Sequence, residues 1–136
     1  MQIQERIRVA NDAMPNLDGH FVLYWMTSAR RTSSNFALDR AVHWAEELQK
    51  PLLIFEALRC DYRWASARMH AFVIAGMRDN SDACRKANVA YYPYLEPHSG
   101  AGRGLLEQLS NAACLVITDE FPSFFLPRMQ SRAAQV

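Results

Sequence analysis

Short apolar runs and longer stretches with helical spacing alternate along the chain. The apolar runs cover 21–26, 52–55, 89–92 and 114–118. The first two runs lack polar alternation, which is typical of strands covered on both sides, as in a parallel sheet between helices. Pro93 directly follows the third run, so this strand is predicted to lie at an edge of the sheet or to end there.

Three stretches between these runs predict amphipathic helices over about 38–48, 66–88 and 105–109. At the start of the first helix, Ser33 or Ser34 can accept hydrogen bonds from the free backbone amides. The second helix has the longest stripe, which comprises Met69, Phe72, Val73, Gly76, Met77, Asn80 and Cys84.

A strand, a helix and a second strand in about 35 residues form a βαβ unit, whose crossover is almost always right-handed. We therefore predict an α/β fold, a Rossmann-like doubly wound parallel sheet. Four strands with helices on both faces would give three α/β/α layers. The predicted domain covers residues 1–136.

The two ends of the chain depart from this pattern. A short helical turn is expected over 5–10. Residues 121–126 are too apolar for a tail, and 129–136 contain helix formers without a stop signal. We therefore expect a chain that is truncated at its C-terminal end, with the apolar segment covered by a following domain.

Composition changes this picture little. The chain has 136 residues, 15 Lys plus Arg against 14 Asp plus Glu, and 50% hydrophobic residues, which predicts one folded domain. A net charge of +1 gives no general attraction to nucleic acid. No apolar run is long enough for a membrane span, and no signal peptide is evident, so a soluble, cytoplasmic protein is expected.

Familiar chemical motifs are missing from the sequence. It contains neither G-x-G-x-x-G nor a P-loop, and its four His residues show no metal-ligand spacing. Its three Cys residues form no C-x-x-C, and no Ser lies in G-x-S-x-G. We therefore assign no catalytic residue and no metal ligand.

The carboxyl ends of the predicted strands are the remaining place for a ligand, because open α/β sheets bind ligands there. Ordinary capping and turn roles are the alternative for each of these polar groups. Arginines also gather in the loops after the first two strands, where they could contact phosphate or pair with nearby acids. The candidate cofactor-binding residues are Met26, Thr27, Ser28, Phe55, Glu56 and Asp119.

Four short sequence phrases are informative because of their order and spacing along the chain. They are Y-W-M at 24–26, R-x-x-x-N-x-A-L at 31–38, R-x-x-x-F-x-x-x-G-M at 68–77, and V-I-T-D at 116–119 followed by Pro122. In this order and spacing they resemble the N-terminal α/β domain of class II cyclobutane pyrimidine dimer photolyases, within the photolyase and cryptochrome family.

The resemblance covers nearly the whole chain and includes Glu5-Arg6-Ile7 and Asn11 near its start. The chain departs from the family at two positions. The family usually has Asp before the Asn of the second phrase and Trp after it, where this chain has Ser34 and Phe36.

The resemblance implies a DNA-repair flavoprotein, a light-dependent lyase that splits pyrimidine dimers. In that family the α/β domain supports a helical domain that carries FAD, binds damaged DNA and performs catalysis. The present domain would scaffold that partner, encoded in cis or separately, and would lack repair activity alone. An antenna chromophore, a deazaflavin or a folate, is the ligand that the resemblance brings to the α/β domain.

Two other functions compete with this interpretation. One is a stand-alone Rossmann-like module that binds a nucleotide or another small ligand, although the phosphate-binding glycines are missing. The other is a light-sensing fragment of the cryptochrome type, since repair and signalling relatives differ mainly in the helical domain. A non-functional gene remnant is a third alternative.

Overall fold

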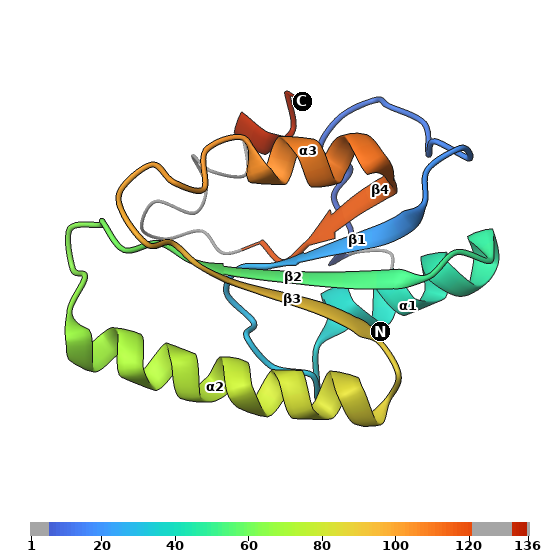
Figure 1. Cartoon of the computed structure of the whole chain (residues 1–136). Helices are drawn as coiled ribbons and strands as arrows, with labels where there is room; N and C mark the ends of the chain where they lie inside the picture. Colours follow the sequence, from blue (N-terminus) through green and yellow to red (C-terminus); the bar gives the residue numbers. More distant parts are fainter. Residues whose placement is uncertain (1–5, 121–131, 136) are drawn as a thin grey trace.

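The computed structural model describes residues 6–120 and 132–135, which form a parallel sheet with helices packed around it (Figure 1). The strand order is β3-β2-β1-β4, and every neighbouring pair is parallel. The elements are β1 (Phe21–Met26), α1 (Phe36–Leu48), β2 (Leu52–Leu58), α2 (Ala67–Lys86), β3 (Ala90–Leu95), α3 (Leu105–Ala112) and β4 (Ala113–Thr118).

β1 is a central strand because it pairs with β2 on one side and with β4 on the other. Val22, Leu23 and Tyr24 are completely buried. A strand in this position needs apolar side chains on both faces, which explains its unbroken apolar run. The predicted parallel sheet is confirmed.

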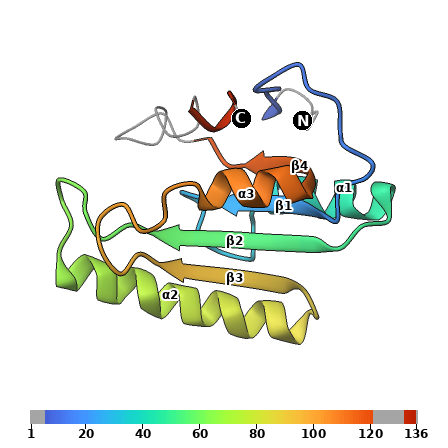
Figure 2. The same ribbon diagram turned by 45° about the horizontal axis from the view of Figure 1, so that its top comes forward.

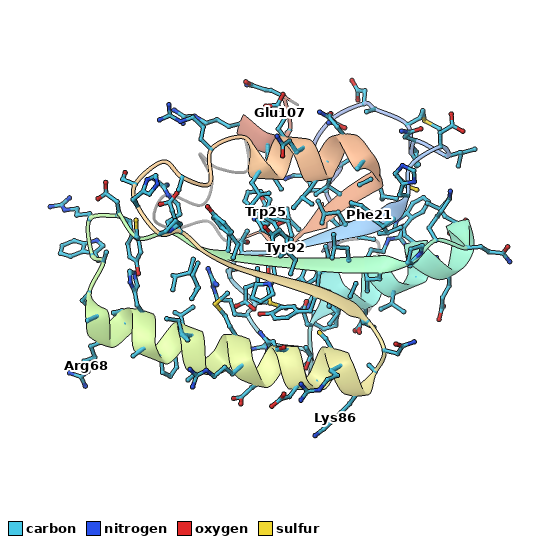
Figure 3. All side chains as sticks on the ribbon, viewed as in Figure 1. Phe21, Trp25, Arg68, Lys86, Tyr92 and Glu107 are labelled. Carbon is cyan, nitrogen blue, oxygen red and sulfur yellow. The ribbon has the colours of Figure 1, made fainter. Side chains whose placement is uncertain are left out.

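Helices cover both faces of this sheet. Val22, Tyr24 and Ile54 pack against α1 and Cys84 of α2, whereas Leu23, Trp25 and Phe55 pack against α3. Figure 2 shows α2 and α3 on opposite sides of the strands, and Figure 3 shows Trp25 on the side of α3. The Rossmann-like, three-layer α/β/α prediction is therefore confirmed.

The end of β2 and the cap of α1 differ from the predictions because tertiary contacts decide them. β2 continues to Leu58, so Glu56 lies within the strand and not in the following loop. The N-cap of α1 is Asn35, and neither Ser33 nor Ser34 has this role. The Asn35 side chain accepts a hydrogen bond from the Leu38 amide and also donates into the protein interior, where an exposed serine does not reach.

The edge-strand prediction for β3 is correct, but the strand runs through Pro93 to Leu95. Proline is tolerated there because an edge strand has one side without a partner. The helical turn expected over 5–10 is wrong for residues 7–10, which have no regular structure. The expectations for 121–126 and 129–131 lie outside the described residues.

The apolar stripe of α2 is only half buried. Met77, Asn80 and Cys84 are buried near its C-terminal end, whereas Met69 and Phe72 are 52% and 79% exposed. The first half of the helix therefore extends beyond the part that packs against the sheet. Within the described ranges, no helix combines the length and the apolar character that crossing a membrane requires.

Gly19 lies buried beside the start of β4. A Cβ atom at this position would lie 2.4 Å from the Cys114 nitrogen and 2.5 Å from the Ala113 carbonyl carbon. These backbone atoms belong to a paired strand and cannot move aside easily. A residue with a side chain at position 19 would therefore push β4 away from its place in the sheet.

We expect Gly19→Ala to lower the free energy of unfolding by about 1–3 kcal/mol, as overpacking does elsewhere. The control Gly76→Ala should raise it by roughly 0.5–1 kcal/mol, because Gly76 lies inside α2 and its Cβ would meet nothing within 4 Å. Urea denaturation followed by circular dichroism measures both changes. Equal stability of Gly19→Ala and the wild type would contradict the close approach.

Candidate functional site

The sheet has a topological switch between β1 and β4. The connection through α1 leads from β1 to β2 on one face, whereas α3 leads from β3 to β4 on the other. Doubly wound sheets bind ligands beyond the carboxyl ends of the strands at such a switch. In this chain Thr27 follows β1 there and Asp119 follows β4.

The Asp119 carboxylate crosses this switch and binds the loop after β1. Its Oδ1 accepts hydrogen bonds from the backbone amides of Thr27 at 3.2 Å and Ser28 at 3.0 Å, and its Oδ2 accepts one from Ala29 at 2.9 Å. The Thr27 hydroxyl also donates to Oδ1. Three consecutive backbone amides thus converge on one carboxylate.

Tyr24 and Asn35 extend the hydrogen bonding around the Asp119 carboxylate. The Tyr24 hydroxyl donates to Oδ2 of Asp119 at 3.0 Å and accepts a hydrogen bond from Asn35 Nδ2 at 2.9 Å. Asn35 Nδ2 also lies 3.1 Å and 2.9 Å from the carbonyl oxygens of Ala29 and Arg31. The N-cap of α1 therefore orients both the tyrosine and the loop.

A second carboxylate, that of Glu56, is completely buried beside this group. Its Oε1 pairs with Arg30 at 3.1 Å, and its Oε2 accepts from Asn80 at 2.9 Å and from the Tyr91 hydroxyl at 2.5 Å. These donors come from the loop after β1, from α2 and from β3. A buried carboxylate with such partners fixes the positions of three separate elements.

Arg30 connects Glu56 to the loop that Asp119 binds. Besides Glu56, its guanidinium donates to the carbonyl oxygens of Ala57 at 2.9 Å and Thr27 at 3.1 Å. It therefore ties the loop after β1 to β2. We call the whole arrangement the strand-end network; its side chains are Tyr24, Thr27, Arg30, Asn35, Glu56, Asn80, Tyr91 and Asp119.

Burial and neighbouring charges set the protonation states in the strand-end network. Burial and the charge of Asp119 raise the pKa of Tyr24, although the hydrogen bond from Asn35 acts to lower it. Burial and the hydrogen bond to Glu56 raise the pKa of Tyr91. Both phenols therefore remain donors. Burial also acts to raise the pKa of Asp119, but the hydrogen bonds from Thr27, Ser28 and Ala29 outweigh it and hold this pKa below its ordinary value of 3.8.

The six predicted cofactor-binding residues do not all face the same space. Thr27, Ser28 and Asp119 lie together at the switch, as the topology predicts. Glu56 lies opposite Met26 in the register, and both belong to the buried interior. Phe55 points to the other face of the sheet, where it packs in the cluster beneath α3.

Sequence reasoning missed four members of the strand-end network. One available signal was Asn80, an amide in the middle of an apolar helical stripe, because a buried amide needs a polar partner. Glu56, an acid directly after an apolar run, was itself among the predicted residues and is the partner that Asn80 requires. Tyr24 and Tyr91 gave no such signal, since they lie within apolar runs. The missed residues are Tyr24, Asn35, Asn80 and Tyr91, whereas the Arg30–Glu56 ion pair agrees with the expected pairing of a loop arginine with a nearby acid.

The chemistry of this site is that of a hydrogen-bonded scaffold. The carboxylate oxygens of Glu56 and Asp119 already accept hydrogen bonds from the chain itself. An antenna pigment or a nucleotide that needed these acceptors would have to displace those donors, so this arrangement fits such a ligand poorly. Across 6–120 and 132–135, no group of three or more His, Cys, Asp or Glu residues is arranged to hold a metal ion.

Comparisons with known proteins find a relative in sequence and a neighbour in structure. The chain is 38% identical over 85 residues to a deoxyribodipyrimidine photo-lyase from Methanothermobacter thermautotrophicus, and this region covers 62% of the chain and 19% of that photo-lyase. A solved structure from the universal stress protein family of Burkholderia pseudomallei is 18% identical and covers 76% of this chain and 97% of its own, with a TM-score of 0.38. No protein-family model matches the chain.

The buried ion pair gives a prediction about stability. Glu56→Ala leaves Arg30, Asn80 and Tyr91 without their shared acceptor, so we expect it to lower the free energy of unfolding by about 3 kcal/mol. The control Glu47→Ala removes an exposed acid of α1 that pairs with His43, and it should change stability by less than about 0.5 kcal/mol. Urea denaturation of the two variants tests this, and equal losses would contradict the role of Glu56.

The lowered pKa of Asp119 gives a prediction about pH. Because this pKa is lower in the folded chain than in the unfolded one, its stabilisation is present above pH 3.8 and is lost as the pH falls through the folded value. Asp119→Asn should therefore show a weaker loss of stability below pH 3.8. Tyr24→Phe, which removes one donor to the carboxylate, should give an intermediate slope.

Urea denaturation at a series of acid pH values measures these slopes. The same slope in the wild type and in Asp119→Asn would show that the carboxylate contributes nothing to acid stability.

Proposed function

We propose that this chain is the α/β domain of a photolyase-like protein of the class II type, and that it scaffolds a helical FAD-binding partner. The observation that carries this proposal is the 38% identity over 85 residues to a deoxyribodipyrimidine photo-lyase. The aligned region covers only 19% of that photo-lyase, so repair activity, FAD and damaged DNA enter here through the proposed partner and not through this chain's own residues.

The strand-end network is a second observation that supports the proposal. Tyr24, Asn35 and Asp119 come from three separate phrases of the class II resemblance, and in the fold they form a continuous hydrogen-bonded chain. Residues that are scattered in sequence thus share one structural task, which is to hold the loop after β1. This task is expected of a scaffold, whose surface must be presented in a fixed shape to its partner domain.

The proposal assigns a division of labour. Light-driven splitting of a pyrimidine dimer requires a flavin, which supplies the electron, and a pocket for the flipped-out lesion. Both belong to the helical partner, linked in cis or supplied as a separate chain. The present chain contributes a rigid α/β body against which that partner is held. An antenna pigment would need a place other than the carboxylates of the strand-end network as they are arranged here.

A chimera tests this proposal. The matched segment of this chain replaces the corresponding segment of the Methanothermobacter photo-lyase, and light-dependent repair of an oligonucleotide with a thymine dimer is measured. We expect a chimera that retains flavin absorbance at roughly 450 nm and repairs in light but not in the dark. The matched control is the same chimera with Glu56→Ala, which should lose flavin and activity together because the scaffold is weakened.

The chain alone is the second control and should show neither flavin absorbance nor repair. A chimera that folds, as circular dichroism reports, but retains no flavin would argue against the photolyase assignment. Flavin bound by the chain alone would also contradict it, since the proposal gives FAD to the partner.

A further inference from the structure

The loop after β1 is built like a receptor for an anion. The amides of Thr27, Ser28 and Ala29 point toward one place, and the Thr27 hydroxyl donates into the same place. Successive backbone N–H groups arranged in this way form a concavity that binds carboxylate or phosphate oxygens. The group that lies in it is the Asp119 carboxylate, which belongs to the chain itself.

The position of this loop is equally informative. It lies at the switch between β1 and β4, where doubly wound proteins receive the anionic part of their ligands. In such proteins the ligand brings the negative charge. Here the end of β4 brings it, and the Thr118 hydroxyl holds that end against β1 by donating to the Trp25 carbonyl oxygen at 2.8 Å.

The loop is held in shape by contacts that do not involve Asp119. Arg30 binds Glu56 and the carbonyl oxygens of Ala57 and Thr27, and Asn35 binds the carbonyl oxygens of Ala29 and Arg31. These bonds hold the loop from behind, on the side of its carbonyl groups. The amides of the loop would therefore keep their direction if the carboxylate left.

We propose that the loop of residues 27–30 is an oxyanion receptor, for a compact carboxylate or phosphate group, and that Asp119 is its built-in occupant. With Asp119 in place, the receptor is closed to phosphate groups from solution. This excludes nucleotides from the position where a doubly wound sheet would otherwise bind them. The inference rests on the fold and the contacts alone, and it is independent of the proposed function.

Replacement of the occupant tests the receptor. Asp119→Ala removes the carboxylate and leaves the amides in place, so formate or inorganic phosphate should bind there. We expect the melting temperature of Asp119→Ala to rise saturably by about 5 °C or more as either anion replaces chloride at constant ionic strength. The wild type and the control Glu120→Ala should not respond, because Glu120 is an exposed neighbour that pairs with Arg8 and lies outside the receptor.

A titration with ADP distinguishes a nucleotide from a small oxyanion. Stabilisation of the wild type by ADP would overturn the proposal, because Asp119 should exclude that phosphate. The absence of any response of Asp119→Ala to formate and phosphate, or an equal response of all three proteins, would also overturn it.

A refolding measurement covers the case in which Asp119→Ala does not fold in chloride. Formate added during refolding should then restore the native circular dichroism, and failure to do so would count against the receptor.

A second variant tests the position of the bound anion. Combining Asp119→Ala with Thr27→Val removes one donor from the receptor and should reduce the response to formate. An unchanged response in the double variant would show that formate binds elsewhere.

Discussion

Burial of carboxylate groups is the constraint on which the carboxyl end of this sheet depends. Glu56 has lost all contact with water, and Asp119 has lost much of it, so each charge must be matched by donors from the chain. The donors are contributed by β1, the loop after it, α2 and β3. A charge that requires partners from so many elements permits few alternative arrangements of them, and the loop after β1 obtains its fixed shape in this way.

Much of the fold could be predicted from the sequence because the burial of strands and helix faces leaves a pattern of apolar positions. β1 is covered on both faces, and its unbroken apolar run records this directly. Boundaries set by tertiary partners leave no such pattern. From the sequence, Glu56 has the pattern of a loop residue, and only its contacts with Asn80 and Tyr91 explain its place in the strand. Asn35 and two serines are all suitable N-cap residues for α1, and the hydrogen bond to Tyr24 favours Asn35.

The candidate site could be predicted in position but not in composition. Topology alone brings Thr27 and Asp119 together, because the carboxyl ends of neighbouring parallel strands share an edge. The tyrosines of the strand-end network could not be predicted, since an aromatic residue in an apolar run has the same pattern whether its hydroxyl is bonded or not. The network also changes how the site is interpreted: groups that looked available to a ligand are used to hold the chain together.

The placement of Pro93 has a consequence for self-association. An exposed strand edge offers amides to any extended segment that approaches it, and such edges promote aggregation. Pro93 lies in the middle of β3, an edge strand, and its ring replaces an amide that would face outward there. An incoming segment would therefore find a gap in the row of donors at the centre of β3. The edge of the sheet at β3 is thus protected against unwanted extension.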